Sequence, residues 1–197
     1  MPPVTKVLLI ANVAVYLFQQ FADNTLVVWF ALWPLATPAA GAPAGFLPWQ
    51  IVTYSFLHGS ELHILVNMLG LYMFGSEVER VLGPRRYLVY YFGSVLTAAV
   101  AQLIMSAVSA GPPYPTVGAS GGVFGLLLAY GIFFPRRIVM LIFPPIPMPA
   151  WLFVIVYAGI ELYLGVTGTQ AGVAHFAHLG GMLGGFIMLQ YWRRSRF

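Results

Sequence analysis

The chain has no cysteine and few charged residues. Without thiols it cannot form a disulfide, a thiolate metal site or a cysteine nucleophile. Charged residues make up only 7% of the sequence, whereas soluble domains carry about 25%. Because hydrophobic residues make up 60%, the chain cannot cover itself with a polar surface. We therefore expect an integral protein of the lipid bilayer.

Long apolar segments predict the architecture. A helix that crosses a bilayer needs roughly 20 mostly apolar residues. Six segments meet or approach this length, at about 5–22, 61–81, 86–109, 119–134, 150–167 and 173–192. The segment between the first two has an apolar run that is too short to cross, and its tryptophans favour the membrane interface. We expect one all-α domain over residues 1–197, a bundle of six transmembrane helices with a long interfacial first loop. The first helix is expected to be retained, not removed as a signal peptide.

The basic residues predict the orientation of these helices. All nine lie before the first helix, between the second and third, between the fourth and fifth, or after the sixth: Lys6, Arg80, Arg85, Arg86, Arg136, Arg137, Arg193, Arg194 and Arg196. With six spans these four places share one side, which the positive-inside rule makes cytoplasmic. We expect both termini in the cytoplasm and the cell membrane as the location. The net charge of +4 then reflects topology and not binding to nucleic acid.

A serine and a histidine are expected at membrane depth, where polar groups are costly and by default functional. In the expected topology His63, Asn67, Ser120 and His178 all lie in the outer half of the bilayer. The helix that begins at Ser120 has about 15 residues and is roughly 22 Å long, while the hydrocarbon core is about 30 Å thick. If its inner end reaches Arg136, Ser120 lies below the outer surface at the floor of a cavity.

Glycines spaced four residues apart recur in the fourth and sixth helices. The pairs are Gly118/Gly122, Gly121/Gly125, Gly180/Gly184 and Gly181/Gly185. Small residues at this spacing let helix backbones approach closely. Such an approach would bring the Ser120 hydroxyl within hydrogen-bond reach of His178, which could act as general base. His63, Asn67 and the backbone N–H of Ser120 could stabilise an oxyanion.

Other interpretations of the polar residues stay open. Ser120 could be a small packing residue, and Asn67 could join helices by hydrogen bonding. His175, one turn before His178, is a rival base, but we expect it to pack or hydrogen-bond near the cavity. His58 is expected to order the first loop.

Two acidic residues and four histidines bear on the same site. Glu161 is the only plausible third member of a triad within a span, and Asp23 begins the first loop. Nothing in the sequence places either carboxylate beside His178, so we expect a dyad. Four histidines allow a zinc site, yet the chain has no HExxH motif. We expect neither a metal nor a cofactor.

Three motifs in this order resemble those of the rhomboid intramembrane serine proteases. Residues 58–67 resemble the family's H-x4-H-x3-N segment, residues 118–121 its GxSG motif, and residues 177–185 its AHxxGxxxG motif. The resemblance implies a Ser120–His178 dyad, with Gly118 and Gly121 flanking the serine. It also implies an oxyanion site that includes His63 and Asn67, and transmembrane segments of other proteins as substrates.

Two further positions bear on the resemblance. Phe124 matches a position where the family has an aromatic ring near the catalytic histidine. Trp49-Gln50 departs from the Trp-Arg of many members, which puts the arginine's role in shaping the loop in doubt.

Two other functional classes stay open. A rhomboid-like pseudoenzyme would bind membrane helices without cutting them, but the intact serine and histidine argue against it. A small transporter or proton relay would use intramembrane histidine and glutamate. It would need polar residues through the inner half of the bundle, and these are sparse.

Overall fold

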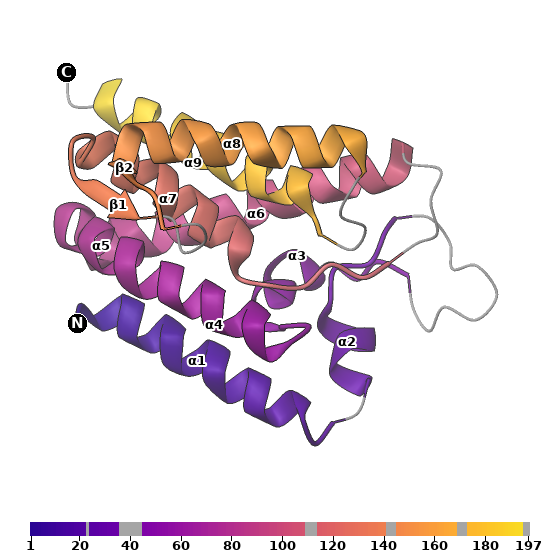
Figure 1. Ribbon diagram of the computed structural model, residues 1–197. Coiled ribbons are helices and arrows are strands. Elements are labelled where there is room, and N and C mark those ends of the chain that lie inside the picture. Colours follow the sequence, from indigo (N-terminus) through magenta and orange to yellow (C-terminus); the bar gives the residue numbers. More distant parts are fainter. Residues whose placement is uncertain (23, 36–44, 109–113, 141–144, 169–172, 195–197) are drawn as a thin grey trace.

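The computed structural model describes residues 1–22, 24–35, 45–108, 114–140, 145–168 and 173–194, and most of these are helical (Figure 1). In chain order the elements are α1 (Pro3–Gln19), α2 (Thr25–Phe30), α3 (Gln50–Thr53), the 3₁₀ turn η1 (Tyr54–Phe56), α4 (Glu61–Gly70), the π-helical η2 (Leu71–Gly75), α5 (Ser76–Leu82), α6 (Pro84–Val108), α7 (Ser120–Phe133), β1 (Ile138–Met140), β2 (Pro147–Pro149), α8 (Ala150–Thr167) and α9 (His175–Arg194).

Each segment expected to span the membrane contains a helix. The second expected helix consists of α4, η2 and α5, which follow one another without a break. Within the described residues, α6 and α8 are long and apolar enough to cross a membrane, whereas α1 and α7 are apolar but shorter. The count of six spans and the interfacial first loop therefore stay predictions. Residues 36–44 of that loop lie outside the described part of the chain.

The expectation of an all-α fold is wrong in one respect. Between α7 and α8 the chain forms a two-stranded antiparallel hairpin, with Val139 of β1 opposite Met148 of β2. Prolines are compatible with an isolated pair like this one, because their missing N–H groups can face away from the partner strand. The hairpin leads directly into α8, where the Ala150 N–H donates to the Arg137 carbonyl at 2.8 Å.

Helix α9 packs most extensively against α6 and α7. Glycines make this possible: a Cβ at Gly181 would overlap the carbonyl oxygen of Gly121, and one at Gly184 would overlap the side chain of Thr97. The close approach of α7 and α9 predicted from the glycine spacing is confirmed.

A buried carboxylate from α5 holds the start of α1. Glu79 accepts hydrogen bonds from the backbone N–H groups of Val4 and Thr5 at 2.9 and 2.7 Å, and from the Thr5 hydroxyl at 2.7 Å. The first N–H groups of a helix have no partner within the helix, and a negative charge suits the positive end of its dipole. Glu79 is thus a cap supplied from a distant part of the sequence.

The chain ends and the hairpin lie together. Figure 1 shows the start of α1, the end of α9 and the β1–β2 hairpin at the same end of the bundle. Lys6 lies near the start of α1, Arg136 and Arg137 precede β1, and Arg193 and Arg194 end α9, so these five basic residues lie at that end. For these segments the arrangement agrees with the expectation that the basic residues share one side.

Candidate active site

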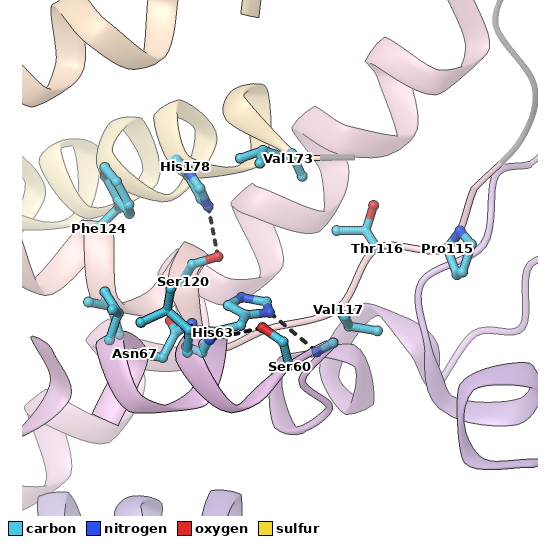
Figure 2. A pocket seen from close by; sticks show the side chains of 15 residues that line it. Ser60, His63, Asn67, Pro115, Thr116, Val117, Ser120, Phe124, Val173 and His178 are labelled. Atoms are coloured by element: carbon cyan, nitrogen blue, oxygen red, sulfur yellow. Dashed lines mark hydrogen bonds between the residues drawn. The ribbon is translucent and has the colours of Figure 1, made fainter. Parts of the chain in front are cut away.

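Ser120 and His178 meet where α7 and α9 begin. Ser120 is the first residue of α7, and His178 lies in the first turn of α9. The Ser120 Oγ is 2.8 Å from His178 Nε2 (Figure 2). The structure therefore has the hydroxyl–imidazole contact that a serine nucleophile and its base require.

The sequence placed no carboxylate beside His178 and therefore predicted a dyad, but the structure has a carboxylate there. Glu161 on α8 is buried, and its Oε2 is 2.9 Å from His178 Nδ1. An ionised carboxylate can only accept a hydrogen bond, so Nδ1 carries the proton. Nε2 is then the acceptor, and the Ser120 hydroxyl donates to it. Asp23, the other acid considered, lies outside the described residues.

His175 shares the same carboxylate oxygen. Its Nδ1 is 2.7 Å from Glu161 Oε2, and its Nε2 is buried with no hydrogen-bond partner among the described residues. An imidazolium would bury an unpaired N–H at Nε2, which is costly. The arrangement therefore fits a neutral His175 that donates from Nδ1. His175 was expected to pack or hydrogen-bond near the cavity, and it does form a hydrogen bond there.

Glu161, His175 and His178 also make a possible metal-ligand set, since their ligand atoms lie within 4.8 Å of one another. Two atoms on one tetrahedral zinc, each at about 2.0–2.1 Å from it, would be roughly 3.3 Å apart. The observed O···N separations of 2.7 and 2.9 Å are shorter. They match charge-assisted hydrogen bonds, so the geometry favours a protonated Nδ1 on each ring.

The ring of Phe124 lies flat on that of His178. The two ring centroids are 4.3 Å apart and the planes differ by 3°. Phe124 is one turn beyond Ser120 on α7, so one helix presents both the hydroxyl and the ring that faces the imidazole. The contact limits rotation of His178 about its side-chain bonds.

A cavity of about 520 Å³ opens beside Ser120. Its lining comes from the start of α4, the segment before α7, the first turns of α7 and the start of α9: Gly59, Ser60, Leu62, His63, Val66, Asn67, Pro115, Thr116, Val117, Ser120, Val123, Phe124, Val173, Ala174 and His178. Figure 2 shows Ser120 between His178 on one side and His63 and Asn67 on the other. The four side chains expected in the site all line this cavity.

His63 is held in a defined tautomer. The Gly59 N–H points at its Nδ1, at 3.3 Å, so Nδ1 accepts and Nε2 carries the proton. The Nε2 edge lies against Gly118, which has a φ of 125° and where a Cβ would come within 2.7 Å of that nitrogen. Glycine is therefore required at 118 both for its backbone conformation and for the approach of His63.

Asn67 lies one turn beyond His63. Its Nδ2 donates to the His63 carbonyl at 2.9 Å, which uses one of its two N–H bonds. Asn67 also lines the cavity.

His58 orders the first loop through its backbone. Its N–H donates to Gln19 Oε1 at 3.0 Å, and its carbonyl accepts from Gln19 Nε2 at 3.3 Å. The ring is buried edge-on against His63 and Tyr16. Burial, with a smaller contribution from His63, lowers the pKa of His58 to about 4.

The segment that leads to Ser120 is fixed by backbone hydrogen bonds. Thr116 and Leu32 exchange two N–H···O bonds of 2.9 Å, and the Gly118 N–H donates to the Tyr54 carbonyl at 2.9 Å. Tyr54 is buried and its hydroxyl donates to the Val95 carbonyl at 2.8 Å. These contacts join the first loop to the serine, and residue types alone gave no signal for them.

Gln50 serves the same loop. Its buried side chain accepts from the Trp33 and Leu47 N–H groups at 3.2 Å and donates to the Trp29 carbonyl at 3.4 Å. Gln50, which stands in place of the arginine of the Trp-Arg pattern, thus still connects residues 29–33 to Leu47 by hydrogen bonds.

Comparison with known proteins adds an independent observation. The model of the Rhomboid domain family matches residues 46–195. Rhomboid protease GluP of Bacillus subtilis (strain 168) is 30% identical over 70% of this chain and 25% of its own length. RHOMBOID-like protein 4 of Arabidopsis thaliana is 35% identical over 71% of this chain and 33% of its own. Rhomboid protease GlpG of Salmonella choleraesuis (strain SC-B67) is 33% identical over 65% of this chain and 42% of its own. The chain thus spans less than half the length of each of these relatives.

Proposed function

The chain belongs to the rhomboid family, and from this we propose that it is an intramembrane serine endopeptidase that cleaves transmembrane segments of other membrane proteins. Ser120 is the nucleophile and His178 is its base. The observation that carries the proposal is the 2.8 Å contact between Ser120 Oγ and His178 Nε2 at the edge of a cavity. No cofactor takes part.

Acylation begins with attack of Ser120 Oγ on the scissile carbonyl carbon. The hydroxyl proton passes to His178 Nε2 as the C–O bond forms, and the carbonyl oxygen becomes an oxyanion. His178 then returns the proton to the leaving amine as the C–N bond breaks. The product is an acyl-enzyme on Ser120.

The oxyanion is stabilised by donors around the cavity. His63 offers an Nε2–H, because its Nδ1 already accepts from Gly59. Asn67 offers its second amide N–H, and the backbone N–H of Ser120 is one of those left without an intrahelical partner at the start of α7. Such preorganised donors act strongly where water is scarce.

Deacylation needs a water molecule at the acyl carbon. The cavity beside Ser120 gives water a route to this atom. His178 takes a proton from the water, hydroxide attacks the ester carbon, and Ser120 recovers its proton as the C–O bond breaks. In the proposed topology of six spans with both termini in the cytoplasm, the cavity opens to the outer face.

Labelling with a fluorophosphonate tests the proposal. The detergent-solubilised wild type should react, whereas Ser120→Ala and His178→Ala should not. Ser106→Ala is the matched control, because among the described residues the Ser106 hydroxyl bonds only to the Leu103 carbonyl of its own helix, and Ser106 does not line the cavity. The same four proteins in liposomes should show the same order in cleavage of a single-span substrate.

Two results would contradict it. A folded wild type that does not label but still binds transmembrane helices would be a non-catalytic rhomboid-like protein. Labelling of Ser120→Ala at the wild-type rate would assign the nucleophile to another residue.

A further inference from the structure

One buried carboxylate serves two imidazoles at the site. Glu161 Oε2 is 2.7 Å from His175 Nδ1 and 2.9 Å from His178 Nδ1, and the three side chains come from two different helices. The exposed fractions of the side chains are 10% for Glu161, 5% for His175 and 12% for His178. A charged group this deep is kept only where something compensates it.

We propose that Glu161 is a positioning residue that completes a Ser120–His178–Glu161 triad, with His175 holding the carboxylate from its other side. The inference rests on the proposed protease function and adds a member to its machinery. Two successive hydrogen bonds connect Oγ of the serine, the two nitrogens of His178 and the carboxylate oxygen.

The first task of Glu161 is to select the tautomer of His178. A free imidazole can carry its proton on either nitrogen, and only the Nδ1–H form leaves Nε2 free to accept from Ser120. The carboxylate at Nδ1 enforces that form, while the stacked Phe124 fixes the plane of the ring. The base is then ready before substrate binds.

The second task is to stabilise the charge that forms during attack. When Nε2 takes the serine proton, His178 becomes an imidazolium in surroundings where charges interact strongly. Glu161 remains ionised and pairs with it, and no proton moves to the carboxylate. The cluster passes from a net charge of −1 to zero in this step, because His175 stays neutral.

His175 supports the carboxylate without competing for the serine. Its donated hydrogen bond favours the ionised form of Glu161 and holds Oε2 between the Nδ1 atoms of His175 and His178. Since its Nε2 has no partner among the described residues, it cannot relay a proton further. We therefore expect loss of His175 to affect the rate less than loss of Glu161.

A glutamate-to-glutamine exchange tests the proposal. Glu161→Gln keeps the size of the side chain and removes its charge. It should slow fluorophosphonate labelling by about 10- to 1,000-fold, because loss of a triad acid's charge lets the base adopt the wrong tautomer. The apparent affinity for a single-span substrate should stay the same while kcat falls.

A conservative exchange separates this role from a structural one. Glu161→Asp keeps the charge but shortens the side chain, so it should label faster than Glu161→Gln, because the carboxylate can still accept from His178 Nδ1. A purely structural role would give the opposite order, since Glu161→Gln keeps the size of the side chain.

Glu77→Gln is the matched control, since Glu77 forms surface ion pairs with Arg80 and Arg137 at the other end of the bundle. It should label like the wild type.

A wild-type rate of labelling in Glu161→Gln would overturn the triad and leave the proposed function intact. Failure of the wild type itself to label would overturn both. Loss or gain of wild-type labelling on treatment with a chelator would show a metal in place of the two protons, and would also overturn the proposal.

A measurement on the wild type covers the case in which Glu161→Gln does not fold. Protons shared between an imidazole Nδ1 and a buried carboxylate resonate far downfield of ordinary amides in proton NMR spectra. We expect two such signals, one of which disappears in His178→Ala and the other in His175→Ala. Their absence from the folded wild type would overturn the proposal.

Discussion

Gly181 of α9 lies against the carbonyl of Gly121 of α7, one residue after the serine. Neither helix has a side chain at this crossing, so the two backbones are in direct contact. The contact sets the distance between Ser120 and His178, because each lies within one turn of it on its own helix.

A methyl group at this crossing should separate the serine from the histidine. Gly181→Ala would place a Cβ onto the Gly121 carbonyl, which must move. We expect labelling to fall at least tenfold, because a displacement of about 1 Å can cost 100-fold in rate. Gly159→Ala on α8 is the control, since no atom of the described part of the chain lies within 4 Å of its added Cβ. Labelling of Gly181→Ala at the rate of Gly159→Ala would show that the crossing does not control the site.

The stacked ring of Phe124 should contribute to the rate. Phe124→Leu keeps an apolar side chain but loses the parallel contact with His178. Aromatic pairs contribute about 0.5–1.5 kcal/mol, so we expect labelling to slow about two- to tenfold. Phe124→Tyr retains the ring and should stay near the wild-type rate. If the leucine and tyrosine variants label equally fast, the stacking has no part in catalysis.

Glu79 should matter for stability and not for chemistry. Glu79→Ala leaves two backbone N–H groups and the Thr5 hydroxyl without their acceptor. We expect a loss of about 2–4 kcal/mol in the free energy of unfolding, measured by denaturant titration in mixed micelles. Glu77→Ala removes only ion pairs to the exposed Arg80 and Arg137, so it should lose less than about 1 kcal/mol. Equal losses in the two variants would contradict the capping role.

His58 should make the fold sensitive to acid. Its pKa is lowered to about 4 by burial, below the ordinary value of about 6.5 that it has in the unfolded chain. The unfolded state therefore binds the proton first, and stability falls as pH drops from about 6.5 towards 4. The loss at pH 5 should be about 2 kcal/mol. His58→Gln does not titrate, so its Tm should fall less between pH 7 and pH 5. Parallel Tm curves for the two proteins would assign the acid sensitivity to other groups.

The sequence was most informative where small residues dictate geometry. The glycines of α7 and α9 allow only a close crossing, so the approach of Ser120 and His178 followed from spacing. The place of Phe124 beside the histidine was expected from the resemblance to the rhomboid family and not from spacing.

The sequence does not predict the contact between Glu161 and His178, and the reason is physical. Helix α8 is apolar on nearly every side, so its sequence does not indicate which face meets α9. Only packing shows that the glutamate faces His178. The hairpin was missed for another reason: prolines are depleted in strands, and a ladder of three residues has no alternation long enough to detect.

The π-helical turn η2 lies between two parts of one continuous helix that contact different partners. Its residues place His63 and Asn67 at the cavity on one side and Glu79 at the start of α1 on the other. In an α-helix each residue rotates the side-chain direction by about 100° about the helix axis. A π turn holds about one residue more than an α turn. Deleting one residue from 71–75 would rotate Glu79 away from α1 by that angle if the cavity residues kept their place. The extra residue thus sets the rotation about the helix axis between α4 and α5. One continuous helix can therefore direct His63 and Asn67 to the cavity and Glu79 to the start of α1.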